Sequence, residues 1–315
     1  MKKTANQRIK TNQEGMKNVS SFSLQPAAGG PSLKARGLGG TIGATAPMSV
    51  VHRRPAGRRL LPIRAKVLKN EKENSLVSLL TLDLQMPDAQ PGRFLMAWRP
   101  GMDEKPMSIA EVKPRLQLAI AAAGPCSKKL AETKAGECIY VRGPLGKPFW
   151  PVGKKWLLVG GGYGFAPLRF LARVGIENGC AVESICGART KDLLMKDGPG
   201  KNHQTTDDGS AGTKGNVLTA LEPLLKDKKL KFDCVYSCGP EKMMKAVAEM
   251  AKKYGTRSQL SVERYMKCGF GVCGHCAMGG WLACYDGPSI DGEEALANPA
   301  FGAYHTDKAG RKLKY

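Results

Sequence analysis

The segment KWLLVGGGYGFAPLRF, residues 155–170, sets the architecture of the chain. Its first five residues predict a buried strand, residues 160–164 form a glycine-rich turn, and a helix is expected over residues 166–177. A strand, a glycine turn and a helix in this order open a parallel α/β domain. The same domain is expected to contain strands at residues 181–186 and 232–236 and helices at residues 216–225 and 241–254. The polar, Gly-rich residues 197–214 are expected to contain a surface loop.

The residues before this segment have a different pattern. Short apolar stretches alternate there with turn residues, which is typical of a small antiparallel barrel. The stretches are residues 75–84, 93–98, 115–122 and 137–142. At 315 residues the chain is long enough for two domains and a small additional segment. We therefore predict a multidomain chain of the α+β and α/β classes.

Four cysteines near the end of the chain have the most specific spacing in the sequence. They form the pattern C-x4-C-x2-C-x7-C and are Cys268, Cys273, Cys276 and Cys284. The first three follow the spacing of plant-type two-iron, two-sulfur clusters, in which four thiolates converge on two adjacent irons. Glycines lie among them and let backbone N–H groups turn toward sulfur. The sequence therefore predicts a 2Fe-2S cluster on these four thiolates.

Other uses of the cysteines stay open. Structural zinc sites usually pair two short knuckles, whereas only Cys273 and Cys276 form a C-x-x-C here. A disulfide is less expected in a reducing compartment. Five other cysteines have no ligand spacing and are expected to be small buried apolar residues: Cys126, Cys138, Cys180, Cys186 and Cys234.

Two turns are expected to bind a nucleotide at the carboxyl edge of the parallel sheet. The glycine turn would admit a pyrophosphate, although tight packing alone would also require glycine there. A second turn, CGPEKMM at residues 238–244, again follows a strand and starts a helix. The candidate residues are Gly160, Gly162, Gly164, Pro167, Cys238, Gly239 and Pro240.

The charge of the chain is uneven. Lys and Arg number 49 against 27 Asp and Glu, a net charge of +22, and half of that excess lies in residues 1–64, where Glu14 is the only acid. This segment has the composition of a disordered extension, an organelle transit peptide or a nucleic-acid-binding arm. Alternatively, the start site of the protein is placed too early. Nucleic acid is a less expected partner because aromatics are not interleaved with the basic residues. No membrane span is expected, and without a secretory signal pattern we expect a cytoplasmic location.

Five motifs together resemble the ferredoxin-NADP reductase superfamily. They are KPMSI at 105–109, GPLGKPF at 143–149, GGGYGFAP at 160–167, CGPEKMM at 238–244 and the cysteine run at 263–288. Over residues 60–292 the sequence is most similar to the electron-transfer subunits of NAD-dependent dihydroorotate dehydrogenase. The resemblance implies a flavin-binding β-barrel domain at 60–151, an NAD-binding α/β domain at 152–258 and a 2Fe-2S segment at 259–294. From composition, we expect a disordered basic extension at 1–59 and a basic tail at 295–315.

The resemblance also implies flavin-binding residues. Ser108 would hydrogen-bond the flavin, Lys105 would meet its phosphate, and Ser127 would contact its diphosphate, unless Ser127 belongs to an ordinary turn. The implied set is Lys105, Pro106, Met107, Ser108, Ala122, Gly124, Ser127 and Gly143. Lys105 replaces the usual Arg and Met107 replaces an aromatic residue. FAD rather than FMN is therefore inherited from the resemblance.

The implied function is electron transfer between NAD and a protein partner through FAD and the 2Fe-2S cluster. The partner would be an FMN-containing dihydroorotate dehydrogenase catalytic subunit in a heterotetramer serving pyrimidine synthesis, so no catalytic residue for dihydroorotate is expected on this chain. An alternative is a reductase subunit of a hydrogenase, sulfide dehydrogenase or sulfite reductase. NADP also stays open, because Arg189 could meet a 2′-phosphate.

Overall fold

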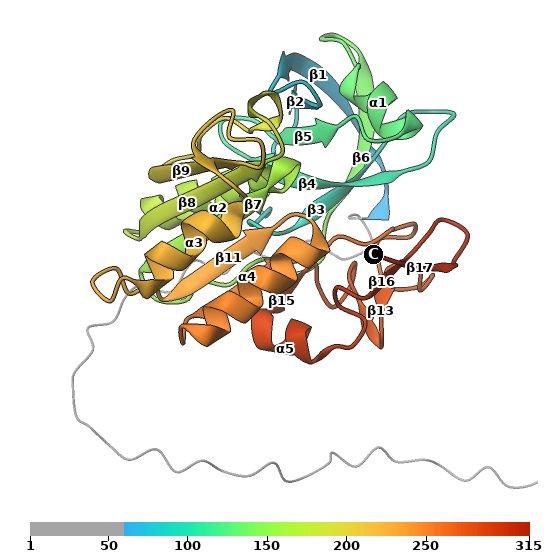
Figure 1. Cartoon of the computed structure of the whole chain (residues 1–315). Helices are drawn as coiled ribbons and strands as arrows, with labels where there is room; N and C mark the ends of the chain where they lie inside the picture. The colour runs from blue at the N-terminus through green and yellow to red at the C-terminus, as the bar shows by residue number, and fades with distance from the viewer. Residues whose placement is uncertain (1–59) are drawn as a thin grey trace, which may run out of the picture. The chain divides into compact units, whose positions relative to one another are not determined.

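The computed structural model describes residues 60–315, so the predicted extension at residues 1–59 lies outside the described residues. The described residues belong to one compact unit. Along the chain they form a barrel, an α/β sheet and a C-terminal part that returns to both (Figure 1). This arrangement confirms the predicted fold class.

The barrel is closed, antiparallel and six-stranded, in the order β1-β2-β5-β4-β3-β6. Its elements are β1 (Ile63–Lys72), β2 (Val77–Leu82), β3 (Phe94–Trp98), β4 (Lys105–Glu111), β5 (Gln117–Ala121), α1 (Pro125–Ala131) and β6 (Cys138–Leu145). Alternate residues fill the interior, where Val67, Leu80 and Leu118 are fully buried. The apolar stretches did not predict β1, because only alternate residues of IRAKVLKNEK face the core.

The α/β part is a seven-stranded sheet in the order β10-β9-β8-β7-β11-β12-β15, parallel except for the β12–β15 pair. Its strands are β7 (Lys155–Gly161), β8 (Ala181–Ala188), β9 (Lys201–Thr206), β10 (Thr213–Lys214), β11 (Cys234–Cys238), β12 (Arg257–Ser261) and β15 (Ser289–Asp291). The predicted surface loop within residues 197–214 corresponds to the turn at 207–212, which lies between β9 and β10. These strands lie at the sheet edge, where polar side chains can stay exposed.

Three long helices cover the sheet. They are α2 (Phe165–Glu177), α3 (Val217–Lys226) and α4 (Glu241–Lys253), and two short 3-10 turns are η2 (Gly162–Gly164) and η3 (Lys191–Leu193). Helix α2 packs on one face of the sheet, whereas α3 and α4 share a core on the other. Helix α2 also joins the barrel, because Phe170 enters the barrel core and Arg173 pairs with Glu111 of β4 at 2.5 Å. This contact packs the barrel against α2, on the face of the sheet that this helix covers.

The C-terminal part contains β13 (Ala277–Met278), β14 (Trp281–Leu282), α5 (Gly292–Ala297), β16 (Tyr304–Thr306) and β17 (Lys312–Lys314). The cysteine loop packs on the barrel, with Cys276 and Cys284 in one cluster with Phe94 and Met96. Residues 295–315, predicted as a basic tail, include the β16–β17 hairpin. Among residues 60–315, no helix is both long and apolar enough to cross a membrane.

Candidate functional site

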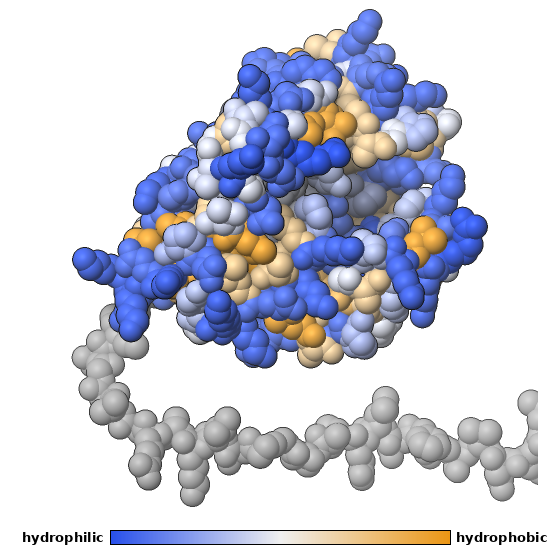
Figure 2. Space-filling view, viewed as in Figure 1, coloured by the Kyte–Doolittle hydropathy of each residue, from blue (hydrophilic) through white to orange (hydrophobic). Residues whose placement is uncertain are grey.

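A cavity of about 240 Å³ lies where the barrel, the sheet edge and the C-terminal part meet. This face of the molecule is hollowed between the barrel and the parts below it (Figure 2). Barrel residues Lys105–Ser108 line one side, residues Gly164 and Pro167 of the glycine turn and α2 line another, and residues 261–264 close a third. Five of the predicted flavin residues and two of the predicted nucleotide residues, Gly164 and Pro167, therefore line one cavity.

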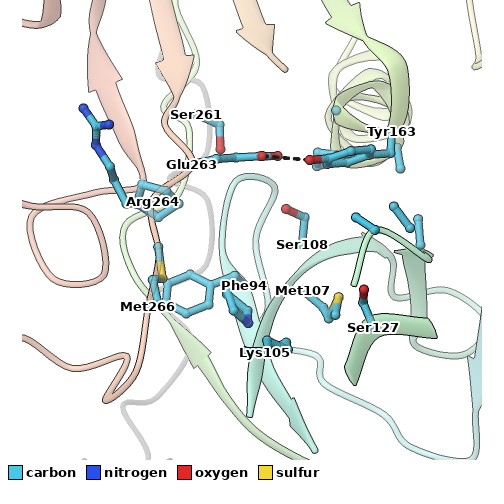
Figure 3. Close-up of a pocket in the computed structure, with 18 of the residues that line it drawn as sticks. Phe94, Lys105, Met107, Ser108, Ser127, Tyr163, Ser261, Glu263, Arg264 and Met266 are labelled. Carbon is cyan, nitrogen blue, oxygen red and sulfur yellow. Dashed lines mark hydrogen bonds between the residues drawn. The ribbon is translucent and has the colours of Figure 1, made fainter. Parts of the chain in front are cut away.

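The barrel wall is mostly apolar with polar atoms at its rim. Met107 is buried, while Ser108 and Ser127 turn toward the cavity (Figure 3). Lys105 lies 5.0 Å above the ring of Tyr265 and 3.6 Å from the Asp103 carboxylate. A planar apolar ring system with polar edges would fit such a wall.

Some of the predicted flavin residues do not line this cavity. They are Ala122, Gly124 and Gly143; Ala123 contributes instead. Gly143 has a φ of 135°, and a Cβ on it would lie 2.7 Å from Leu95 Cδ2, so packing alone requires glycine there. The Gly124 N–H donates to Ser127 Oγ at 3.0 Å, so the Ser127 hydroxyl also caps α1.

The two predicted nucleotide-binding turns touch each other. Strands β7 and β11 pair so that Gly160 lies opposite Cys238. A Cβ on Gly164 would lie 2.5 Å from the Cys238 carbonyl oxygen, and one on Gly160 would lie 2.7 Å from Phe165. These two glycines therefore serve close packing. Gly162 differs, because its φ is 53° and nothing lies within 4 Å of its Cβ position, which leaves its backbone open to a ligand.

The sequence interpretation missed a polar pair at the cavity. The Tyr163 hydroxyl lies 3.2 Å from Glu263 Oε2, as Figure 3 shows. Removal from water raises the pKa of the Glu263 carboxyl to about 7, and the bond from Tyr163 opposes this only partly. Glu263 is the first residue of the cysteine run at 263–288, but that run was interpreted only as a cluster segment.

The cysteine loop directs backbone N–H groups at its sulfurs. The Val272 and Cys273 N–H groups point at Cys268 Sγ, both at 3.4 Å, and the Gly271 N–H points at Cys284 Sγ at 3.2 Å. Positive φ angles at three glycines make this possible. The three are Gly269, Gly271 and Gly274. Such bonds stabilise thiolates, which are the form that binds iron.

The four cysteines lie as two pairs. Cys276 Sγ and Cys284 Sγ are 3.3 Å apart, and Cys268 interacts with Cys273 through its sulfur. Within residues 60–315, no group of three or more His, Cys, Asp or Glu side chains is arranged around one metal position. Two pairs suit two adjacent irons better than a single tetrahedral zinc.

The local field favours ionised sulfur in each pair. Burial opposes ionisation of Cys268, but the N–H groups of Phe270, Cys273 and Val272 lower its pKa to about 7. The neighbouring Cys284 thiol lowers the pKa of Cys276 to about 6, and the pKa of Cys284 itself is raised by Cys276. The four cysteine sulfurs therefore fit an iron-sulfur cluster, which binds cysteines as thiolates.

Arg142, whose side chain is buried, joins the cysteine loop to the barrel. Arg142 of β6 bonds Glu104 through two nitrogens, with Nε–Oε1 at 2.8 Å, and donates from Nη2 to the Cys268 carbonyl oxygen at 2.7 Å. The Arg142 side chain is 7% exposed. Because Glu104 precedes Lys105, this contact fixes the cluster loop next to the predicted flavin wall.

Known proteins resemble both the cysteine segment and the whole described chain. Residues 263–296 match the family model of the iron-sulfur cluster binding domain of dihydroorotate dehydrogenase B. A Methanocaldococcus jannaschii protein named probable dihydroorotate dehydrogenase B (NAD(+)), electron transfer subunit, is 39% identical over 81% of this chain and 99% of its own length. A Thermoplasma volcanium protein of the same name is 36% identical over 80% of this chain and 98% of its own length.

A solved structure is also similar. It is that of an NADH-dependent reduced ferredoxin-NADP oxidoreductase, which is 32% identical with a TM-score of 0.66, over 73% of this chain and 88% of that one. The similar fold thus accompanies 32% sequence identity over most of both chains. The chain belongs to the family of dihydroorotate dehydrogenase B electron transfer subunits.

Proposed function

We propose that this chain is the electron-transfer subunit of an NAD-linked dihydroorotate dehydrogenase in pyrimidine synthesis. The barrel domain at residues 60–151 holds FAD, the α/β domain at 152–258 binds NAD, and the segment at 259–294 holds the 2Fe-2S cluster. The oxidation of dihydroorotate belongs to an FMN-containing partner in a heterotetramer, and the location is cytoplasmic. Residues 1–59 and 295–315 flank these parts.

The observation that carries the proposal is the junction of three elements at one cavity. Lys105–Ser108 of β4, Gly164 beside the CGP turn, and Met266 just before the first cysteine all line it. The Arg142 contact holds the cysteine loop against the same barrel wall. Short separations between redox sites are what a chain of electron transfers requires.

A bound flavin exchanges two electrons with a nicotinamide and one electron at a time with an iron-sulfur cluster. The residues of this chain supply the binding and orientation. With flavin bound, Met107 would exclude water from its ring, Ser108 would offer a hydroxyl to it, and Ser127 would offer one to its diphosphate. Glu263, with a pKa raised to about 7, can hold or release a proton at its carboxyl near neutral pH.

The surface around the cysteine loop supports docking of a protein partner. Three apolar side chains are exposed there: Phe270 at 40%, Val272 at 76% and Tyr285 at 64%. Cys273 is itself exposed, so a partner that covers this patch would bring its own redox group close to the cluster. Exposed apolar patches of this kind mark interaction sites.

The test uses the chain purified anaerobically together with the catalytic subunit. The visible spectrum is recorded during reduction by dihydroorotate and, separately, by NADH. Bleaching by both donors is expected. Bleaching by NADH alone would support the NAD-linked reductase activity but exclude dihydroorotate as the electron donor. That result would favour the alternative of a hydrogenase, sulfide dehydrogenase or sulfite reductase partner. NADPH in place of NADH decides the choice of nucleotide.

A further inference from the structure

A hydrogen bond links the glycine turn to the segment that follows β12 across one side of the cavity. Tyr163, the middle residue of η2, has its hydroxyl 3.2 Å from Glu263 Oε2. Both residues line the cavity together with Ser108 and Met107 of the barrel wall. Figure 3 shows the bond on the side of the cavity that faces these two barrel residues. The pair therefore bridges the cavity opposite the predicted flavin wall.

The Tyr163 hydroxyl is the donor of this bond. The negative charge of Glu263 raises the pKa of the Tyr163 phenol, so the phenol keeps its proton. A phenol that donates to a carboxylate makes a charge-assisted bond. The separation of 3.2 Å is long for an O–H donor, so the bond has about the net strength of an ordinary hydrogen bond. Such a bond favours the joined form of the pair but can be broken by a ligand.

With the pair joined, the cavity has room for one ring system. Its volume is about 240 Å³. Pockets that hold a small-molecule ligand usually have about 300–1,000 Å³. Hydride exchange between a nicotinamide and a bound flavin requires the two rings to lie in contact, with the reacting atoms about 3 to 3.5 Å apart. Both rings therefore do not fit beside the barrel wall while Tyr163 is bonded to Glu263.

The Tyr163 side chain can move without disturbing the turn that carries it. Its ring is 41% exposed, so core packing does not fix it. The preceding residue, Gly162, has a φ of 53° and nothing within 4 Å of its Cβ position, which leaves space around the backbone there. The following residue, Gly164, is packed closely against the Cys238 carbonyl and holds the end of the turn. Tyr163 can therefore swing while the turn stays in place.

The carboxylate side of the pair is held in position. Val262 and Arg264, on either side of Glu263, are buried, and Arg264 pairs with Glu241 of α4 at 2.8 Å. The Val262 N–H also donates to the Pro288 carbonyl oxygen at 2.9 Å. Movement of Tyr163, rather than of Glu263, is therefore the change that separates the pair.

We propose that Tyr163 is a gate for the nicotinamide ring. Its bond to Glu263 closes the passage between the glycine turn and the barrel wall, and the nicotinamide enters when Tyr163 swings away. This inference rests on the proposed function and adds a residue that sets how tightly the nicotinamide end of the nucleotide binds. The diphosphate is expected at the backbone of the glycine turn, so it binds whether the gate is open or closed.

The experiment compares two ligands on the full chain loaded with its flavin and cluster. The protein is oxidised and kept at about pH 8, where the Glu263 carboxyl, with a pKa of about 7, is ionised. Titration calorimetry measures the affinity for NAD⁺, which carries the nicotinamide, and for ADP-ribose, which lacks it. Tyr163→Phe removes the bond, and Tyr163→Ser removes the ring as well. The matched control is Tyr254→Phe, which removes a bond of 2.8 Å from a tyrosine to Glu222 of α3, outside the cavity.

Only the affinity for NAD⁺ should change. Tyr163→Phe should bind NAD⁺ about fivefold more tightly than wild type, because an ordinary hydrogen bond keeps the closed form in about that excess and only the open form admits the ring. Tyr163→Ser should show an equal or larger gain. ADP-ribose should bind every protein within about twofold of wild type, since a ligand with equal affinity for both forms does not depend on the gate. The control Tyr254→Phe should match wild type for both ligands.

Unchanged or weaker NAD⁺ binding by Tyr163→Phe would overturn the inference, even if Tyr163→Ser binds more tightly, because the proposed closure depends on the bond. Equal gains for NAD⁺ and ADP-ribose, or an equal gain in Tyr254→Phe, would also overturn it. Reduction by saturating NADH is recorded on the same samples. If NADH reduces every protein but the affinities do not change, the proposed function stands and the gate falls. If the affinities change as expected but NADH reduces none of the proteins, the gate stands and the electron-transfer function falls.

Discussion

Replacing Arg142 with Ala should loosen the cysteine loop from the barrel. The change removes the ion pair with Glu104, the bond from Nη2 to the Cys268 carbonyl oxygen, and the guanidinium that lies 5.7 Å from the Phe270 ring. A bond from a charged donor contributes about 1.5 kcal/mol, equivalent to about tenfold in a rate of loop opening. Leaving a buried ion-pair partner alone costs about 3 kcal/mol, but Glu104 is 26% exposed and can regain water.

We therefore expect iron to leave Arg142→Ala about 10 to 100 times faster than wild type in the presence of a chelator, as followed by loss of visible absorbance. The matched control is Arg173→Ala, which breaks the partly buried pair with Glu111, at the other end of β4 from Glu104. It should lower the unfolding temperature without accelerating iron loss. Equal iron release from both variants would refute a specific link between Arg142 and the loop.

Three other changes give separate tests. Gly164→Ala should destabilise the chain by about 1 to 3 kcal/mol, because its Cβ would lie 2.5 Å from the Cys238 carbonyl oxygen. Gly124→Ala is the control and should cost little stability, because its Cβ would meet nothing within 4 Å. Thermal unfolding compares the two variants, and similar midpoints would contradict the packing argument. The folded-state pKa of Glu263 is raised to about 7, so the folded chain binds one more proton than the unfolded chain between about pH 4.5 and 7, and this stabilisation is lost as the pH rises through 7. The unfolding midpoint of Glu263→Gln should lack that decline. Parallel pH profiles of the two unfolding midpoints would contradict this role of Glu263. Tyr315→Phe removes the hydroxyl that bonds both Glu241 and Arg264, and it should lower the free energy of unfolding by about 1 to 2 kcal/mol. Proteolysis of the β16–β17 hairpin should also be faster in this variant. Equal cleavage rates in the variant and in wild type would mean that these bonds do not hold the hairpin.

Local patterns in the sequence predicted much of the fold. Lys155–Gly161, the glycine turn and α2 follow from apolar length and glycine position, and the predicted helix start at residue 166 is one residue late. The polar strand β9 and the charged strand β1 escaped detection, since strands with one exposed face carry few apolar residues. Edge and barrel strands become visible only when their neighbours are known.

The site was predictable in its parts and not in its assembly. The spacing of the cysteines suggested two irons, and the sulfur pairing agrees with that expectation. Gly143 resembled a ligand residue, but its environment shows a packing role. Glu263 and the β16–β17 hairpin gave no motif, because their positions depend on contacts between segments far apart in the chain.

The most direct test of the central claim is electron paramagnetic resonance of the isolated chain, prepared anaerobically and titrated with NADH, with iron, zinc and flavin measured on the same sample. The account predicts two irons and one flavin per chain and a signal from the reduced cluster that appears after NADH is added. A colourless, zinc-containing chain without that signal would contradict it.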